Sequence, residues 1–215
     1  MKQQKIVIVD YGIGNLFSVK RALEVSGAED ISIAYSAREI KLADKVILPG
    51  VGAFSDGMNG LQKRNLVEPV MEFAESGKML LGICLGMQLL ATESEEYGSC
   101  QGLNIIPGRV VPIPGEVSKG IHRKIPYIGW SRLIMPRDGI WVNSLLNGLD
   151  INDWLYMVHS FHVQPTSKAD ILAVYDYEGY TVTAAIRSGN IYGYQFHPEK
   201  SGPIGLRLIR NFLES

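Results

Sequence analysis

The stretch LLGICLGMQLL, residues 80–90, places one cysteine between two glycines where an apolar run meets a helical pattern. The apolar residues up to Ile83 have the pattern of a strand buried on both faces. Gly82 and Gly86 stand two positions on either side of Cys84, which is the spacing of a nucleophile elbow, a sharp strand-to-helix turn. The stretch therefore predicts a central strand that presents Cys84 in a tight turn. A buried structural cysteine explains the stretch equally well when it is taken alone.

Strand and helix patterns alternate through the sequence before this stretch and into it. Apolar and β-branched runs predict strands at 5–9, 31–35, 45–50 and 78–84. Helices are predicted at 16–27 with Asn15 as the cap, from Ser36 with Glu39 in capping-box spacing, and from the loop after Gly50 to about Gly77. Such alternation is typical of an α/β fold with a mostly parallel sheet and helices on both faces.

The second half of the chain has a different pattern. From about Gly102 to Tyr194 short strands alternate with turns, and residues 188–190 carry a hairpin signal. The segment 202–215 returns to a helical pattern. No linker or repeat divides the chain, so we expect one domain, residues 1–215. The expected fold class is α/β with three layers: helices flank a mostly parallel central sheet, and an antiparallel β-rich part occupies the second half.

Composition argues against several classes of function. There are 21 Lys and Arg residues against 22 Asp and Glu residues, and the basic ones are scattered, so no nucleic-acid or membrane partner is expected. The N-terminus lacks the apolar core of a secretion signal. Two cysteines are too few for a disulfide framework, and no metal-ligand spacing is present. The GxG at 12–14 is followed by Phe17 where a dinucleotide fingerprint needs a glycine. We expect a cytoplasmic protein with no metal and no cofactor.

The place of Cys84 at the start of a predicted helix favours thiol chemistry. The helix dipole there favours the thiolate over the thiol. The backbone amide of Leu85 would face an attacked carbonyl, as one donor of an oxyanion hole. Gln88 follows one helical turn after Cys84, so its side-chain amide can face the same site.

A nucleophilic cysteine needs a base, and the base needs a group that orients it. His197 lies in the segment FHPEK, with Glu199 two residues further on. Pro198 restrains the backbone toward an extended form, in which residues i and i+2 project to the same side. An exposed loop without a role is the alternative interpretation of this segment alone. Joined to the elbow, it predicts a triad of Cys84, His197 and Glu199.

The loop LPGVGAFSDGM, residues 48–58, is a third candidate part of the site. Its glycines let backbone amides approach a ligand closely, and a second oxyanion donor is expected around Val51 and Gly52. By itself, the loop is better explained as a plain connection from strand to helix. The small basic cluster of Lys119, His122, Arg123 and Lys124 is interpreted as a solvated loop.

GICLGMQ, PGVG and FHPEKS, in this order, resemble the motifs of the class I (triad) glutamine amidotransferases, and the resemblance spans nearly the whole chain. YGIGNLFSV at 11–19, Met87 and YMVHSF at 156–161 resemble one branch in particular. That branch supplies ammonia to imidazole glycerol phosphate synthase in histidine biosynthesis. Ser131 stands where that branch usually has asparagine, and Phe161 where tyrosine is common.

The resemblance implies a substrate, site residues and a partner. The substrate is glutamine, bound by Gly50, Gly52, Gln88 and the backbone at Ser160 and Phe161. The partner is a separate cyclase subunit, a TIM barrel, in a heterodimer. Three alternatives stay open at this point: the glutaminase of an anthranilate or aminodeoxychorismate synthase, a hydrolase that needs no partner, and a non-catalytic regulatory subunit on the same fold.

Overall fold

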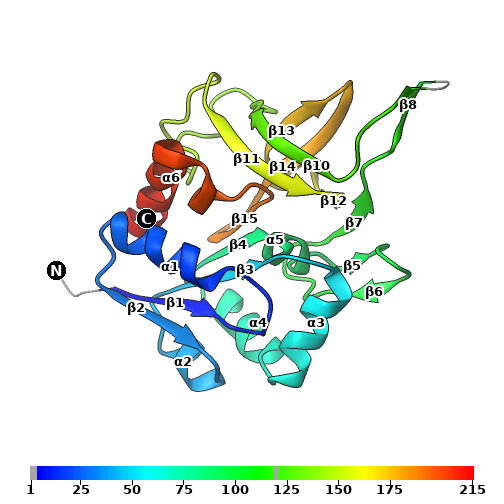
Figure 1. The fold of residues 1–215 in the computed structure, drawn as a ribbon. Helices are drawn as coiled ribbons and strands as arrows, with labels where there is room; N and C mark the ends of the chain where they lie inside the picture. Colours follow the sequence, from blue (N-terminus) through cyan, green and yellow to red (C-terminus); the bar gives the residue numbers. More distant parts are fainter. Residues whose placement is uncertain (1–3, 119–120) are drawn as a thin grey trace.

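In the computed structural model, which describes residues 4–118 and 121–215, a seven-stranded sheet runs through the middle of the molecule (Figure 1). Its strands lie in the order β13-β14-β15-β4-β3-β1-β2. The strands from β15 to β2 are parallel to one another: β15 (Ile191–Tyr194), β4 (Met79–Cys84), β3 (Lys45–Gly50), β1 (Lys5–Val9) and β2 (Asp30–Ala34). β14 (Tyr180–Ser188) and β13 (Ile171–Tyr177) extend the sheet antiparallel. The prediction of a mostly parallel α/β sheet is confirmed.

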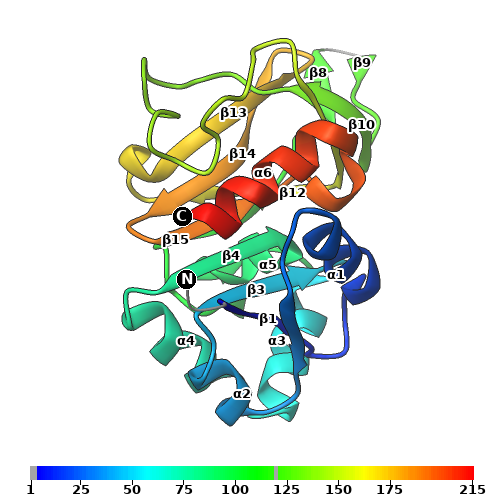
Figure 2. The ribbon, with the colours of Figure 1, turned by 90° about the vertical axis from the view of Figure 1, so that its left-hand side faces the viewer.

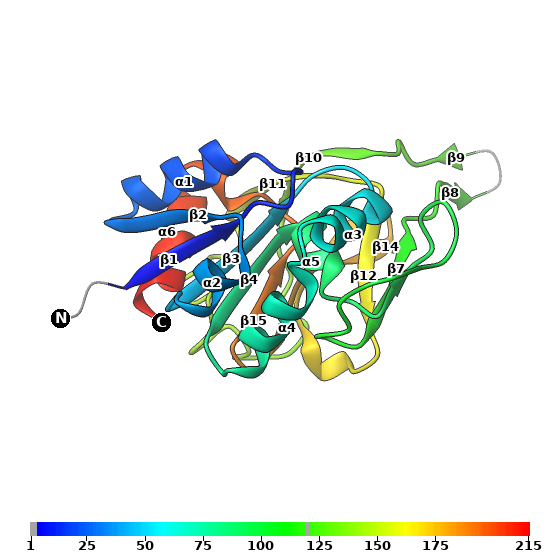
Figure 3. The ribbon, with the colours of Figure 1, turned by 90° about the horizontal axis from the view of Figure 1, so that it is seen from below.

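Each face of the sheet buries its own hydrophobic core. Successive residues of a strand point to opposite faces, so Ile6 and Ile8 enter one core while Val7 and Val9 enter the other. The first core contains residues of α1 (Leu16–Val25) and α6 (Gly202–Glu214), which lie side by side (Figure 2). The second contains residues of α2 (Ala37–Lys41), α3 (Phe54–Lys63), α4 (Val67–Glu75) and α5 (Leu85–Leu89). Figure 3 shows α3, α4 and α5 on the side of the sheet away from α1, as the three-layer prediction requires.

The helical pattern from the loop after Gly50 to Gly77 is divided into two helices, α3 and α4, which the pattern alone did not indicate. The break falls at Asn65, whose φ of +54° is in the left-handed region and cannot continue a right-handed helix. Pro69 lies in the first turn of α4, where a missing backbone N–H costs little.

Of the two predicted helix caps, the one at α1 forms as expected and the one at α2 forms only in part. The side chain of Asn15 accepts a hydrogen bond of 3.1 Å from the amide of Ser18 at the start of α1, as predicted. At α2 the capping box is only partly formed. Glu39 accepts from the hydroxyl of Ser36 at 2.8 Å and from the amide of Tyr35 at 2.9 Å, but Ser36 makes no side-chain cap.

The remaining strands, from β5 to β12, form a β-rich layer beside the main sheet (Figure 1). Four of these strands form a smaller sheet in the order β12-β7-β5-β6: β12 (Phe161–Pro165), β7 (Gly108–Pro112), β5 (Glu93–Ser94) and β6 (Cys100–Gln101). Two antiparallel pairs accompany it: β10 (Tyr127–Arg132) with β11 (Trp154–His159), and β8 (Glu116–Ser118) with β9 (Ile121–His122). Two 3-10 turns, η1 (Lys168–Asp170) and η2 (Pro198–Lys200), complete the elements. The hairpin at residues 188–190 is confirmed, since β14 and β15 pair antiparallel with Ser188 opposite Ile191.

The solvated-loop interpretation of the basic cluster is wrong for Arg123. Its side chain is buried, and its guanidinium donates to the carbonyls of Pro114, Glu116, Tyr177 and Glu178. Five N–H donors in a fixed fork suit such a set of backbone acceptors, which tie the β8–β9 hairpin to the β13–β14 turn. Lys119 lies outside the described residues. In the ranges 4–118 and 121–215, no helix is long and apolar enough to cross a membrane.

Lys45, at the start of β3, is a buried cation that holds the last turn of α6. Its Nζ donates to the carbonyls of Phe212 at 2.7 Å, Leu213 at 2.8 Å and Ser215 at 2.6 Å. We expect Lys45→Met to lower the free energy of unfolding by about 2–3 kcal/mol, because hydrogen bonds to a charged group are lost and carbonyls stay buried. Lys41→Met, which removes the exposed pair with Glu72, is the control and should change it by less than about 1 kcal/mol. Urea unfolding measures both, and equal losses would contradict the capping role.

Candidate functional site

The order of the central strands brings the predicted site residues together. β4 lies between β3 and β15, so the carboxyl ends of these parallel strands meet at one edge of the sheet. Gly50 at the end of β3 pairs with Cys84 at the end of β4, and Tyr194 at the end of β15 pairs with Ile83. The loop after β3, the elbow after β4 and the segment after β15 therefore converge, at the edge where parallel α/β sheets generally bind ligands.

Cys84 has the strained backbone of a nucleophile elbow. Its φ is +54° and its ψ is −110°, a conformation that residues with a side chain rarely adopt. The residue is buried, and α5 begins at the next position, Leu85. The strained turn therefore places the sulfur over the N-terminus of a helix, as the sequence predicted.

The two flanking glycines are required by close backbone approaches. A Cβ on Gly86 would lie 1.7 Å from the carbonyl oxygen of Leu48 on β3, and no rearrangement of a side chain could relieve that contact. A Cβ on Gly82 would lie 2.7 Å from backbone atoms of Gly86 and Met87. A side chain at either position would therefore collide with backbone, and the more severe collision is with the neighbouring strand β3.

His197 and Glu199 form the predicted pair. Nδ1 of His197 lies 2.7 Å from Oε1 of Glu199, and both side chains are 2% exposed. A carboxylate only accepts hydrogen bonds, so Nδ1 carries the proton and Nε2 is the basic nitrogen. Backbone hydrogen bonds fasten the segment to β11: the amide of His197 donates to the carbonyl of Tyr156 at 2.9 Å.

The electrostatics of His197 suit a partner of the thiol. Burial alone lowers the pKa of His197, but hydrogen bonding and charge from Cys84 and from Glu199 outweigh it and raise the pKa from 6.5 to about 9. Among residues 4–118 and 121–215, Nε2 makes no well-formed hydrogen bond, so it is available to exchange a proton with the thiol or a substrate. The arrangement therefore favours the protonated, imidazolium form of His197 beside the sulfur.

A cavity of about 220 Å³ opens over the sulfur. It is smaller than a typical pocket for a drug-sized ligand, so it suits a small metabolite. The predicted residues that line it are Val51, Gly52, Cys84, Leu85, Gln88, Ser160, Phe161 and His197. Gly50 and Glu199 do not line it: Gly50 lies against the hydroxyl of Tyr11, and Glu199 stands behind His197.

Three further polar residues adjoin this cavity and were missed by the sequence reasoning. Glu96 and His159 line it, and Gln195 is fully buried with its Nε2 at 3.6 Å from the sulfur of Cys84. Glu96 also accepts a hydrogen bond of 2.7 Å from the amide of Phe54 at the start of α3. His159 stands inside the motif YMVHSF, and Gln195 directly precedes the motif FHPEKS, so the sequence places both beside predicted site residues.

The side-chain nitrogen of Gln88 is hydrogen-bonded within the protein, whereas its side-chain oxygen is available to a ligand. Nε2 donates to the carbonyl of Phe161 and to Oε1 of Gln195, each at 3.1 Å. Its Oε1 makes no hydrogen bond within the described ranges and remains an acceptor for a donor group of a ligand.

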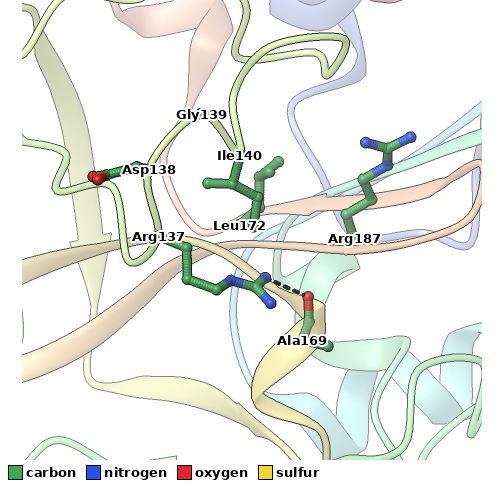
Figure 4. Close-up of a pocket in the computed structure, with 7 residues that line it drawn as sticks. All are labelled: Arg137, Asp138, Gly139, Ile140, Ala169, Leu172 and Arg187. Atoms are coloured by element: carbon green, nitrogen blue, oxygen red, sulfur yellow. Dashed lines mark hydrogen bonds between the residues drawn. The ribbon is translucent and has the colours of Figure 1, made fainter.

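A second hollow, near the β13–β14 part of the sheet, has a different character (Figure 4). It is lined by Arg137, Asp138, Gly139, Ile140, Ala169, Leu172 and Arg187. Arg137 turns toward the carbonyl of Ala169 at 2.8 Å, and Arg187 donates to that of Gly189 at 3.1 Å. Both guanidinium groups are thus engaged by the backbone, and the lining residues include no cysteine, serine, threonine or histidine. Within the described ranges, no group of three His, Cys, Asp or Glu residues could hold a metal ion.

Comparisons with known proteins agree with this geometry. The family described as glutamine amidotransferase class-I matches residues 7–215. The imidazole glycerol phosphate synthase subunit HisH 1 of Legionella pneumophila (strain Paris) is 45% identical over 210 residues, which cover 97% of this chain and 98% of that protein. The subunit HisH of Syntrophotalea carbinolica is 46% identical over 214 residues, 96% of this chain and 98% of that protein.

Solved structures show the same fold at lower identity. A crystal structure of a glutamine amidotransferase has a TM-score of 0.70 at 20% identity and covers 97% of each chain. The structure of PurLQS from Thermotoga maritima has a TM-score of 0.67 at 20% identity, covering 99% of this chain and 98% of that one. The predicted fold class is confirmed.

We expect the free energy of unfolding to fall as the pH rises from about 6.5 to about 9. The pKa of His197 is higher in the folded protein than in the unfolded chain, so its stabilisation is complete below about 6.5 and is lost as the pH passes about 9. The loss should be about 1–3 kcal/mol. Urea unfolding across this range measures it, and His197→Asn, which has no titrating ring, is the control. Identical pH dependence in the two proteins would contradict the raised pKa.

Proposed function

The chain belongs to the class-I glutamine amidotransferase family, and we propose that it is the glutaminase subunit of an imidazole glycerol phosphate synthase. In this role it hydrolyses glutamine to glutamate and ammonia and passes the ammonia to a cyclase subunit. The observation that carries the proposal is the constellation at the sheet edge: a strained cysteine, a buried His–Glu pair and a cavity over the sulfur.

The first half of the reaction forms a thioester. The thiolate of Cys84 attacks the carboxamide carbon of glutamine, and the carbonyl oxygen takes on negative charge. Backbone amides of Leu85 and of the Val51–Gly52 loop form the oxyanion hole that stabilises this charge. His197, protonated at Nε2, gives its proton to the departing nitrogen, so that ammonia leaves and the γ-glutamyl thioester remains.

The second half returns the enzyme to its starting state. His197, now neutral, takes a proton from water, and the hydroxide that forms attacks the thioester carbon. The second oxyanion collapses to glutamate and expels the sulfur of Cys84 as a thiolate. Glu199 keeps the ring oriented through both halves, because its bond to Nδ1 fixes which nitrogen exchanges protons.

The cavity suits a free amino acid. Glu96 presents a carboxylate that already accepts from the Phe54 amide through one oxygen, and its other oxygen can pair with the α-ammonium group of glutamine. The free Oε1 of Gln88 supplies an acceptor deeper in the site. Gly52 and the backbone at Ser160 and Phe161 complete the substrate contacts. Gly50 contributes indirectly, because its pairing with Cys84 keeps the end of β3 close to the nucleophile.

The product requires a partner. Ammonia in neutral water is mostly ammonium, which is not nucleophilic, so a synthase must receive it within an assembly. We propose a heterodimer with a separate cyclase subunit, a TIM barrel, that produces imidazole glycerol phosphate and an aminoimidazole carboxamide ribotide. The names of the relatives, each a subunit of a synthase, support an assembly of this kind.

We also propose that residues 1–215 act as a single glutamine amidotransferase domain in the cytoplasm. The family match over residues 7–215 and the central sheet shared by both cores support one domain. Two free cysteines, one of them the nucleophile, suit a reducing compartment.

Glutamine hydrolysis, measured with and without the cyclase and its ligand, tests this function. The wild type is expected to be slow alone and faster in the complex. In the complex, Cys84→Ala should lower kcat by at least about 10³-fold, because the sulfur that forms the thioester is gone. Cys100→Ala is the matched control and should retain the parental rate, since Cys100 lies outside the cavity.

The two comparisons, of Cys84→Ala with the wild type and of the wild type with and without the cyclase, test different parts of the proposal. Parental turnover in Cys84→Ala would contradict the thioester mechanism. Equal turnover of the wild type with and without the cyclase would contradict the coupling and favour a hydrolase that acts alone.

A further inference from the structure

We propose that Gln195 is a positioning residue that holds an N–H donor on the sulfur of Cys84, and that a chain of hydrogen bonds from Phe161 fixes its orientation. The inference rests on the proposed function, since it assigns Gln195 to the same thiolate. It concerns a residue that belongs neither to the triad nor to the oxyanion hole.

Gln195 is buried directly behind the nucleophile. It follows β15, its side chain is 0% exposed, and its backbone amide donates to the carbonyl of Ala184 at 2.9 Å. Its Nε2 lies 3.6 Å from Sγ of Cys84, and its Oε1 lies 3.1 Å from Nε2 of Gln88. Both ends of the side-chain amide are therefore engaged within the core.

The orientation of both amides follows from one backbone carbonyl. The oxygen of Phe161 can only accept, so Gln88 must present its NH₂ group there, at 3.1 Å. The second N–H of that NH₂ group points at the side chain of Gln195, which must therefore accept the hydrogen bond through its Oε1. If Gln195 were turned over, two NH₂ groups would face each other in a buried site. Its own NH₂ group is thus directed at the sulfur.

A neutral histidine anchors the start of this chain. Nδ1 of His159 lies 2.8 Å from the same carbonyl of Phe161 and must donate to it, so Nε2 accepts from the hydroxyl of Tyr175 at 3.0 Å. Burial lowers the pKa of His159 to about 4, which keeps the ring neutral at physiological pH. Tyr175 therefore donates to His159, which donates to the carbonyl of Phe161. On the other side, Gln88 donates to the same carbonyl and to Gln195, which in turn donates to the sulfur.

The contact with Gln195 favours one protonation state of Cys84. The thiol form can donate to the carbonyl of Val158, 3.9 Å away, whereas an N–H group can only donate. A thiol sulfur accepts only weakly and a thiolate strongly, so Gln195 stabilises the thiolate more than the thiol. Ionisable groups near the sulfur include His197, which supplies positive charge, and Tyr11, whose pKa is raised by burial and by the charge of Cys84. Glu96 and His159 line the same cavity.

The rate of alkylation of Cys84 by iodoacetamide, followed against pH, tests the proposal. A Cys100→Ala background leaves Cys84 as the one remaining cysteine of the sequence. Gln195→Met keeps the length of the side chain and removes the donor. It should move the midpoint of the pH–rate profile up by about 1–2 pH units, the size expected for one hydrogen bond to a charged group. Gln195→Glu, which places only oxygens near the sulfur, should move it further.

The control is a similar change in a neighbouring polar pair. Tyr180 lies 3.2 Å from Nε2 of His162, and Tyr180→Phe should leave the midpoint where it is. If Gln195→Met does not fold, the same alkylation experiment is done on Gln88→Met. This variant removes the hydrogen bond that orients the Gln195 amide, so it should raise the midpoint of the pH–rate profile by a smaller amount. In the assembled complex, a folded Gln195→Met should lower kcat for glutamine by about 10- to 100-fold with little change in KM.

If the midpoint of the pH–rate profile does not shift in folded Gln195→Met, the proposal is overturned, and Gln195 serves only to fill space in the core. A shift of equal size in Tyr180→Phe would do the same, because it would show that the profile responds to the loss of any buried polar pair in this part of the molecule. Alkylation reads the sulfur directly, so these outcomes do not depend on glutamine turnover. A wild-type complex that fails to hydrolyse glutamine would count against the proposed function alone.

Discussion

The contact between the α-carbon of Gly86 and the carbonyl of Leu48 is the constraint on which the site depends. Because no Cβ can fit there, the chain leaving β4 passes directly over the end of β3 and turns into α5. That passage forces Cys84 into a left-handed φ of +54° and lifts its sulfur over the sheet edge. The strain is held by two buried cores, one on each face of the sheet, which leave the turn no room to relax.

Placed in this way, the sulfur meets groups from several distant segments. The parallel pairing of β4 with β15 sets His197 beside it, and the buried carboxylate of Glu199 determines which ring nitrogen is basic. The neighbouring β3 brings the Val51–Gly52 loop to the cavity, and the β-rich layer adds the backbone of Ser160 and Phe161. The polar groups are divided by role: charge comes from His197, while Gln88 and Gln195 are oriented by a carbonyl that cannot donate.

Much of this arrangement could be predicted from the sequence, because local patterns determine it. The buried runs, the Gly82–Cys84–Gly86 spacing and the two-residue spacing of His197 and Glu199 each have a local physical reason. What depends on distant contacts was not predictable in the same way. The break between α3 and α4 depends on a left-handed Asn65, and Arg123 is buried because four carbonyls from two separate turns surround it. The role of Glu96 is visible only once α3 supplies its amide partner.

The central claim is that Cys84 is the nucleophile of a glutamine site, and covalent labelling tests it most directly. The complex with the cyclase would be treated with an electrophilic chloroketone analogue of glutamine, and the modified residue located by peptide mass spectrometry. We predict a single adduct on Cys84 that excess glutamine prevents. A complex in which Cys84 stays unmodified, or in which Cys100 is labelled at the same rate and glutamine protects neither, would contradict the account.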